Sequence, residues 1–402
     1  MSRESPRRIA HLDMDAFYAS VELLRYPQLR GLAVVIGGGS HTRALLEANA
    51  AGRPRAEIPL SAFPRLKGYK GRGVITTATY AARQSGVGSA MGMMKAAALC
   101  PDAILLPVDF EEYKRYSRLF KTTVAEIASV IEDRGIDEIY IDFTSEEGVA
   151  EDGGRALATR LQTSIRERTG LTCSIGVAPN KLLAKMAGEF DKPNGITILF
   201  ERDLEARIWP LSIRKVNGIG PRAEEKLHAA GIKTLGDIAT RERAWLVEHF
   251  GQSYGAWLHD ASHGRDDRQI VTSSEPVSMS RETTFERDLH PVKDRAMLSS
   301  LFTDLCTRLA ADLSRKGFRG KTIGIKLRYE DFSIVSRAAS LDLPTDDAVL
   351  IRQTAGRALK RAPLDKRLRL LGVRVGNLTR ANAEPPRPPE LPLFQYAGIE
   401  VR

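Results

Sequence analysis

Runs of apolar residues alternate with segments of helical spacing through the first half of the chain. The runs at residues 9–12 and 33–36 predict buried strands, and residues 17–24 between them carry apolar side chains at helical spacing. The alternation continues with β-rich runs at 74–80, 139–141 and 173–177 and with helical patterns at 113–131, 153–168 and 180–190. Elements in this order predict an α+β layer, in which helices pack on one mixed or antiparallel sheet.

The pattern changes twice after residue 200, which indicates a multidomain chain. Residues 200–272 look entirely helical, whereas residues 281–380 return to an α+β pattern with strands at 323–329 and 370–375. The polar, proline-containing segment 272–278 between them is typical of a linker. A length of 402 residues also exceeds the roughly 250–300 residues that one hydrophobic core usually serves.

The net charge of +10 is concentrated near the C-terminal end. Residues 281–380 hold 21 Lys and Arg against 12 Asp and Glu, which is nearly the whole excess. A local excess of this kind is typical of a surface that binds a polyanion, most often nucleic acid, although an incidental bias of a solvated surface would look the same. Segment 38–72 is also basic, with seven Lys and Arg against Glu47 and Glu57, and shows little strand pattern. It is interpreted as a solvated loop, with contact to template DNA as the alternative.

The chain has the composition of a cytoplasmic protein without membrane association. No apolar stretch approaches the roughly 18–20 residues that cross a bilayer, and no apolar core follows the charged N-terminus as in a signal peptide. The three cysteines, Cys100, Cys173 and Cys306, are far apart and have no zinc-ligand spacing. They are expected to be reduced, buried thiols.

Two acidic clusters adjoin predicted strands, and these two strands are expected side by side at the centre of the sheet. Asp13 and Asp15 follow the first apolar run, and Asp137 and Glu138 precede the run at 139–141. Like charges held close together repel and lose hydration, so a fold tolerates such a cluster most readily when a cation neutralises it. Carboxylates without accompanying His or Cys suit Mg²⁺ or Mn²⁺. Taken alone, each cluster could equally be a polar strand cap.

A glycine hairpin lies within the helical segment. Gly218 and Gly220 flank one apolar residue, and helical spacing resumes at Ala223. In a helix-hairpin-helix motif these glycines allow backbone N–H groups to approach a DNA phosphate, whatever the base sequence. The alternative is a plain turn between two helices.

Several motifs occur together in an order that resembles one family. They are Asp13-Met-Asp-Ala-Phe-Tyr-Ala-Ser-Val-Glu22, Thr77-Ala-Thr-Tyr-Ala-Ala-Arg83, Gly135-Ile-Asp-Glu138, Ser174-Ile-Gly-Val-Ala-Pro-Asn-Lys-Leu-Leu-Ala-Lys-Met186, Asp191-Lys-Pro-Asn-Gly195 and the hairpin. With these motifs, residues 9–380 resemble a Y-family DNA polymerase of the bacterial polymerase IV type. The resemblance implies a right-hand architecture of palm (1–20 and 111–199), small fingers (21–110, with an extended insertion at 38–72), helical thumb (200–272), linker (273–280), α+β little finger (281–380) and disordered tail (381–402).

The resemblance also implies the site and its cofactors. Two Mg²⁺ ions, or Mn²⁺ in their place, would be held by Asp13, Asp137, Glu138 and the backbone carbonyl of Met14. The same three carboxylates are the implied catalytic residues, whereas Asp15 is left with a structural role. Thr79 and Gly135 depart from the family's usual Asn and Ser but remove no metal ligand.

Residues that would contact the deoxynucleoside triphosphate follow from the same motifs. Tyr18 matches the aromatic gate that lies under the sugar and excludes a 2′-hydroxyl, while Phe17 is expected to belong to the core. Thr77, Tyr80, Arg83 and Lys192 match residues that hold the triphosphate. As isolated residues, Arg83 and Lys192 would be interpreted as solvated surface.

The C-terminal segment carries a further possible motif. Residues 381–390 contain repeated prolines, which predicts disorder, and Glu390 is followed by Leu391, Leu393 and Phe394. This resembles the peptide by which bacterial polymerases bind the β sliding clamp, with Glu in place of the usual Gln. The alternative is an unattached tail.

Three functions remain to be distinguished. The first is a monomeric, error-prone polymerase that binds primer-template DNA and deoxynucleotides, lacks a proofreading exonuclease and carries out translesion synthesis. The second is a non-catalytic polymerase-like scaffold, which the retained carboxylates disfavour. The third is a nucleotidyl cyclase, which would not need the hairpin or the basic C-terminal segment.

Overall fold

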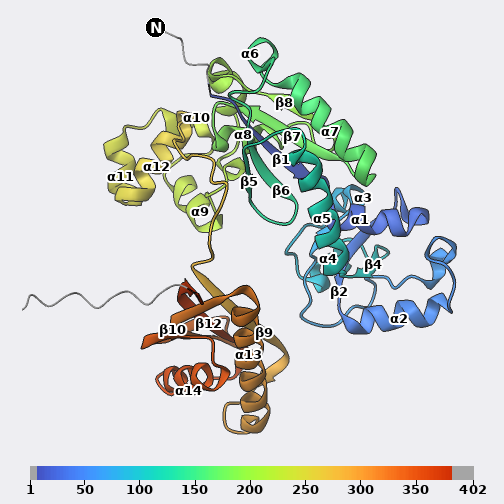
Figure 1. The fold of residues 1–402 in the computed structure, drawn as a ribbon, viewed down its shortest axis with the longest axis vertical. Helices are drawn as coiled ribbons and strands as arrows, with labels where there is room; N and C mark the ends of the chain where they lie inside the picture. Colours follow the sequence, from blue (N-terminus) through green and yellow to red (C-terminus); the bar gives the residue numbers. More distant parts are fainter. Residues whose placement is uncertain (1–6, 383–402) are drawn as a thin grey trace, which may run out of the picture. The chain divides into compact units, whose positions relative to one another are not determined.

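The computed structural model describes residues 7–382 and separates the chain into two units, residues 1–274 and 275–402 (Figure 1). Each unit has its own hydrophobic core. Within the described part of the chain, no helix is both long enough and apolar enough to cross a membrane.

A five-stranded sheet forms the centre of the first unit. Its order is β5 (Ile131–Asp133), β6 (Glu138–Asp142), β1 (Ile9–Met14), β7 (Cys173–Ala178) and β8 (Ile196–Ile198), and β1 is antiparallel to both of its neighbours. Successive side chains of a strand point to opposite faces, so the apolar residues of β1 serve two cores. Leu12 packs with helices α5 (Phe110–Ala125) and α7 (Arg155–Thr169), whereas Ile9 packs with α8 (Lys181–Ala187). The two acidic strands therefore lie side by side, as the sequence predicted.

A smaller sheet and its helices occupy the region expected to form the fingers. The strand order is β3 (Thr77–Ala78), β2 (Val34–Gly38) and β4 (Ile104–Pro107), with β2 parallel to β4. The helices of this region are α1 (Phe17–Arg25), α3 (Tyr80–Gln84) and α4 (Met93–Leu99). Helix α1 begins directly after β1, so its first turn adjoins the acidic end of that strand.

Segment 38–72 is folded, and its interpretation as a solvated loop is wrong. It contains helix α2 (Ser40–Ala50) and the short 3-10 turns η2 (Arg55–Glu57) and η3 (Leu60–Ala62). Leu46, Ile58 and Phe63 are buried in the core that includes β1 and α5. Thr42, Leu46 and Ala50 recur at the i, i+4, i+8 spacing of one helix face, a signal that the surrounding charges obscured.

Two other expected elements differ in length. The helix expected at 113–131 begins at Phe110 and ends at Ala125, because residues 131–133 form the edge strand β5. The predicted helix at 153–168 is α7, preceded by the single turn α6 (Val149–Asp152). The turn η1 (Pro27–Leu29) follows α1.

The rest of the first unit is helical, as expected for a thumb. Short turns η4 (Glu201–Asp203), η5 (Leu204–Ile208) and η6 (Ile213–Lys215) lead to helices α9 (Pro221–Ala229), α10 (Leu235–Ala239), α11 (Arg243–Phe250) and α12 (Gln252–Ser262). Their buried residues share one core with α8.

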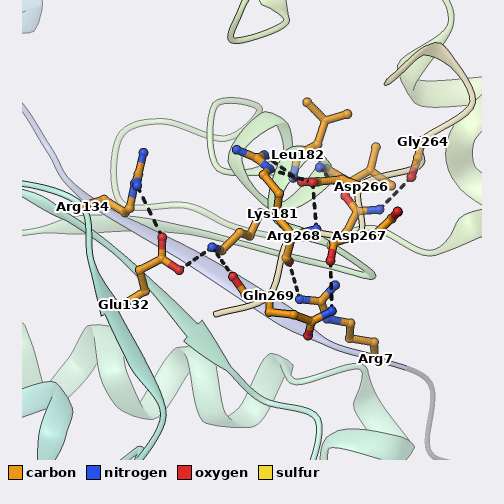
Figure 2. A network of polar contacts seen from close by, with 12 residues as sticks. Arg7, Glu132, Arg134, Lys181, Leu182, Gly264, Asp266, Asp267, Arg268 and Gln269 are labelled. Atoms are coloured by element: carbon orange, nitrogen blue, oxygen red, sulfur yellow. Dashed lines mark hydrogen bonds and ion pairs between the residues drawn. The ribbon is translucent and has the colours of Figure 1, made fainter. Parts of the chain in front are cut away.

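Residues 264–271, termed the strap here, connect the end of the helical region to the edge of the central sheet (Figure 2). The buried Lys181 ammonium pairs with the buried Glu132 carboxylate of β5 and donates to the Gln269 carbonyl at 2.6 Å. Glu132 also accepts the Val271 backbone N–H at 2.7 Å. Further hydrogen bonds join Asn180 to Gly264, Leu182 to Asp266 and Arg7 to Arg268. The strap is thus fixed by one buried ion pair and several backbone contacts.

The second unit is a four-stranded antiparallel sheet with two helices. Its order is β11 (Ile334–Thr345), β10 (Phe318–Tyr329), β12 (Leu368–Arg380) and β9 (Ser278–Leu289). Helices α13 (Arg295–Lys316) and α14 (Ala348–Leu359) pack against it. The strands expected at 323–329 and 370–375 lie within β10 and β12.

The strap gives a testable stability prediction. Replacing Lys181 by Met should lower the free energy of unfolding of the first unit by about 3 kcal/mol, because the buried Glu132 carboxylate loses its buried cation and keeps only the exposed Arg134 at 3.5 Å. Urea unfolding followed by tryptophan fluorescence would measure this, since Trp209, Trp245 and Trp257 all lie in the helical region.

Lys121→Met is the matched control. Lys121 pairs with Asp133, an exposed residue of β5 next to Glu132. Loss of this exposed pair should lower the free energy of unfolding by no more than about 1 kcal/mol. Equal, small effects of the two substitutions would contradict a structural role for the Lys181–Glu132 pair.

Candidate active site

Three carboxylates meet where β1 and β6 pair. Asp13 lies directly across from Glu138 in the antiparallel register, and Asp137 immediately precedes β6. The Met14 backbone N–H donates to the Asp137 carbonyl at 3.0 Å, which fixes the approach of Asp137 to β1. The backbone therefore brings Asp13 together with two acids that are more than 120 residues away along the chain.

Their electrostatic environments differ. The pKa of Asp137 is raised to about 6, first by burial and then by the charges of Asp13 and Glu138. The pKa of Glu138 is instead lowered to about 2, first by its hydrogen bond to His11 and then by Lys185, although burial opposes both. Asp137 is therefore the carboxylate whose charged form is disfavoured, whereas that of Glu138 is stabilised.

Two lysines and one histidine contact these acids. The Lys192 ammonium donates to Asp13 Oδ2 at 2.7 Å and to Glu189, while Lys185 pairs with Glu138. His11 Nε2 lies 3.1 Å from Glu138 Oε2, and burial lowers the pKa of the imidazole. Within residues 7–382, no three His, Cys, Asp or Glu side chains are arranged as a ligand set.

Sequence reasoning missed His11 and Lys185 as parts of the site. His11 precedes Asp13 by two residues, and alternate residues of a strand share a face, so that signal was present. Lys185 occurs in one of the quoted motifs, but only the packing of α8 behind the sheet places its ammonium on Glu138.

A pocket of about 180 Å³ opens beside Asp13 and Asp137. Its lining includes every residue that the sequence assigned to the triphosphate or its sugar, namely Tyr18, Thr77, Tyr80, Arg83 and Lys192. Met14 also lines the pocket, whereas Glu138 does not. The buried Phe17 also reaches the lining, although it was expected only in the core. Two carboxylates, two cations and three aromatic rings therefore surround one small cavity.

Interactions within the pocket hold its polar side chains. Arg83 Nε donates to the Ala78 carbonyl at 3.0 Å, and its guanidinium lies 4.8 Å from the centre of the Tyr80 ring. Burial, with the nearby Asp15 charge, raises the pKa of Tyr80 to about 12. Asp15 is itself buried and accepts hydrogen bonds from Ser174 and the Asn194 backbone N–H, contacts that fit a structural role.

The two departures from the family motifs have local explanations. Thr79 caps helix α3 and accepts the Ala82 backbone N–H, while its hydroxyl also contacts the backbone of β2. Gly135 has a φ of 148°, a conformation that residues with a Cβ rarely adopt. The replacement of Ser by Gly there suits the turn before Asp137.

Glu138 faces a second, larger groove of about 780 Å³ in the same unit. Besides Glu138 and Lys185, the groove is lined by the hairpin that contains Gly218 and Gly220. Gly218 has a φ of 117°, and a Cβ there would lie 2.7 Å from the Trp257 ring, so only glycine fits. Gly220 caps α9, whose first residue is Pro221. Four further cationic residues and one acid, Glu189, also line the groove; the cations are Arg134, Arg214, Lys215 and Arg268.

The residues assigned to clamp binding, Leu391, Leu393 and Phe394, lie outside the described residues.

Comparisons with known proteins agree on one family. Residues 12–189 match the impB/mucB/samB family, residues 276–387 match the C-terminal domain of that family, and residues 201–232 match its helix-hairpin-helix motif. The last match covers Gly218 and Gly220.

Individual relatives extend over nearly the whole chain. DNA polymerase IV of Caulobacter vibrioides is 36% identical over 90% of this chain and 82% of its own length. DNA polymerase IV 2 of Agrobacterium fabrum is 34% identical over 96% of this chain and 99% of its own length. A solved Y-family DNA polymerase chimera shares the fold with a TM-score of 0.76 at 23% identity, covering 93% of this chain and 99% of that chain. The expected palm, fingers, thumb and little finger architecture is confirmed by this shared fold, and the chain belongs to the impB/mucB/samB family of Y-family DNA polymerases, as a member of the bacterial DNA polymerase IV type.

Proposed function

We propose that this chain synthesises DNA on a template by adding deoxynucleotides to a primer 3′-hydroxyl, and that Asp13, Asp137 and Glu138 hold the divalent ions that the reaction needs. The observation that carries the proposal is the small pocket in which two of these carboxylates adjoin Tyr18, Arg83 and Lys192. Membership of the polymerase IV type supports the reaction class.

Asp13, Asp137 and Glu138 are not arranged as a ligand set, because Lys192 pairs with Asp13 and Lys185 with Glu138, but their donor chemistry fits a hard divalent cation. Its ligands would be the oxygens of Asp13, Asp137 and Glu138 with the Met14 carbonyl, and oxygen donors are those that Mg²⁺ and Mn²⁺ prefer. The pKa of Asp137 is raised first by burial and then by repulsion from Asp13 and Glu138, and a bound cation would oppose both effects. Two bound ions would activate the primer hydroxyl and stabilise the pyrophosphate leaving group.

The remaining pocket residues suit a nucleoside triphosphate. Arg83 and Lys192 supply positive charge, and Thr77 and Tyr80 supply hydroxyl donors, around the same cavity. Lys192 bridges Asp13 and Glu189, so it is placed to move from the carboxylate to a phosphate once Asp13 has another cation. Tyr18 would then lie under the sugar and exclude a 2′-hydroxyl.

Primer-template DNA would bind two basic surfaces. In the first unit, the groove between Glu138 and the Gly218–Gly220 hairpin joins a proposed metal ligand to a backbone-binding motif. In the second unit, the sheet carries a hollow of about 570 Å³ rimmed by four cations, Arg281, Lys326, Arg337 and Arg374. Gly324 and Gly376 also line it, and their missing side chains leave room for a phosphate near the backbone, whereas the Glu282 side chain packs over Gly372.

Other parts of the proposal rest on the sequence resemblance. They are low fidelity without proofreading, translesion synthesis in the bacterial cytoplasm as a monomer, and docking of Leu391, Leu393 and Phe394 on the β sliding clamp. Membership of the polymerase IV type supports them.

Primer extension with Mg²⁺ tests the reaction. Asp137→Asn should lower the rate by at least about a thousandfold, because several kcal/mol of transition-state stabilisation disappears with the metal ligand. Asp133→Asn, which alters an exposed carboxylate four residues earlier, should retain the wild-type rate. Wild-type protein that binds primer-template DNA without extending it would favour the scaffold interpretation, and full activity of Asp137→Asn would contradict the metal assignment.

Salt-dependent DNA binding tests the second surface. The double substitution Arg337→Ala/Arg374→Ala should weaken duplex binding and reduce the slope of log K against log salt by about 0.9 for each DNA phosphate that the protein no longer neutralises. Arg357→Ala removes an exposed charge from α14 and should leave the slope unchanged. A reduction of the slope for Arg357→Ala about half as large as that for the double variant, in proportion to the charges removed, would mean that the overall charge, rather than the sheet surface, matters.

A further inference from the structure

We infer that Tyr113, held by Glu22, is a positioning residue that fixes the Tyr18 ring and thereby sets the discrimination between deoxyribonucleotides and ribonucleotides. The inference rests on the proposed function, in which Tyr18 lies under the nucleotide sugar. It assigns roles to two buried residues that are absent from the lining of the Tyr18 pocket.

The Tyr18 ring is stacked on Tyr113. Their ring centres are 4.4 Å apart and their planes differ by 20°, while Phe110 meets both rings edge-on. Tyr18 is partly exposed where it lines the pocket, whereas Tyr113 is fully buried. One face of Tyr18 is therefore supported by a ring that cannot itself move into solvent.

The Tyr113 hydroxyl is held in turn. It donates to Glu22 Oε1 at 2.9 Å, and Glu22 is only 2% exposed. Tyr18 and Glu22 are four residues apart on α1, so they lie on one helix face and Tyr113 contacts both. A tilt of the Tyr113 ring would break its hydrogen bond to Glu22. The hydrogen bond therefore fixes the orientation of the ring on which Tyr18 stacks.

Glu22 is kept in place by charge. Arg25 Nη1 lies 3.2 Å from both Glu22 oxygens and 2.9 Å from Asp109 Oδ2, and Asp109 is the N-cap of α5. Burial raises the pKa of Glu22, while Arg25 and the Tyr113 hydroxyl oppose that rise. The carboxylate thus joins α1, which carries Tyr18, to α5, which carries Tyr113.

The folded insertion supports the other end of α1. Tyr26 packs edge-on against Phe63 with ring centres 5.6 Å apart, and Gln28 Nε2 donates to the carbonyls of Arg55 and Ile58. The Arg55 charge also acts on Glu22. The insertion therefore restrains the helix on which both Tyr18 and Glu22 are carried.

Steric exclusion of a 2′-hydroxyl depends on how far the Tyr18 ring can be displaced away from the sugar. A ribonucleotide differs from a deoxyribonucleotide by one oxygen atom, so a small displacement of the Tyr18 ring would make room for the ribonucleotide. Tyr18 lines the pocket proposed for the nucleotide, and the stack with Tyr113 opposes displacement of the ring away from that pocket. Weakening the stack between Tyr18 and Tyr113 should therefore raise kcat/KM for ribonucleotides far more than it changes kcat/KM for deoxynucleotides.

Single-nucleotide incorporation with matched dNTP and rNTP tests the inference through the ratio of their kcat/KM values. Tyr113→Leu should lower the ratio by about tenfold or more, and Tyr113→Phe, which keeps the ring, by about fivefold, the equivalent of one net hydrogen bond. Most of the change should appear as a lower KM and a higher kcat for the rNTP. Tyr116→Leu, which removes a partly buried ring from the same helix, is the control and should leave the ratio unchanged.

Tyr18→Ala separates the possible failures. A relaxed ratio in Tyr18→Ala together with a wild-type ratio in both Tyr113 variants would overturn the positioning role alone. An unchanged ratio in Tyr18→Ala would remove Tyr18 from the sugar filter and with it the basis of the inference. Should Tyr113→Leu fail to fold, Tyr113→Phe and Glu22→Gln decide, because a purely structural effect would lower both kcat/KM values together and leave their ratio intact.

Discussion

Repulsion among three carboxylates is the constraint on which the rest of the first unit depends. Asp13, Asp137 and Glu138 converge because β1 and β6 pair in a register that sets Asp13 opposite Glu138. Strand β1 is the middle strand of its sheet and is buried on both faces, so the acids at its end cannot separate without breaking the core. Packing of the core therefore holds the three mutually repelling carboxylates close together.

The neighbouring elements supply positive charges that offset the repulsion among these carboxylates. Helix α8 brings Lys185 to Glu138, and the turn after it brings Lys192 to Asp13. Asp15, one position beyond Met14, takes hydrogen bonds from β7 and from the Asn194 backbone, so it ties that turn to the sheet. Asp13 and Asp137 line the pocket and Glu138 lines the hairpin groove, so one acidic strand pair contributes to both the proposed nucleotide and DNA surfaces.

Local pattern predicted the central features well. Strand alternation placed the acids of β1 and β6 at adjacent strand ends, and turn chemistry identified Gly218, which the Trp257 ring shows to be irreplaceable. Contacts between distant segments could not be predicted in the same way. His11 and Glu138 are 127 residues apart, and Tyr113 reaches Glu22 across 91 residues, so only tertiary packing relates them. The insertion was misinterpreted because its few apolar residues, such as Leu46 and Phe63, are dispersed among arginines.

The role of the three carboxylates as metal ligands is tested most directly by counting the Mn²⁺ ions that the protein binds. Electron paramagnetic resonance of free Mn²⁺ would be recorded with primer-template DNA ending in a dideoxynucleotide and the matching dNTP, for wild type, Asp137→Asn and Asp133→Asn. We expect about two ions per wild-type and Asp133→Asn complex, and at least one fewer for Asp137→Asn. Equal binding by all three proteins would contradict the claim that the acidic strand pair holds divalent cations.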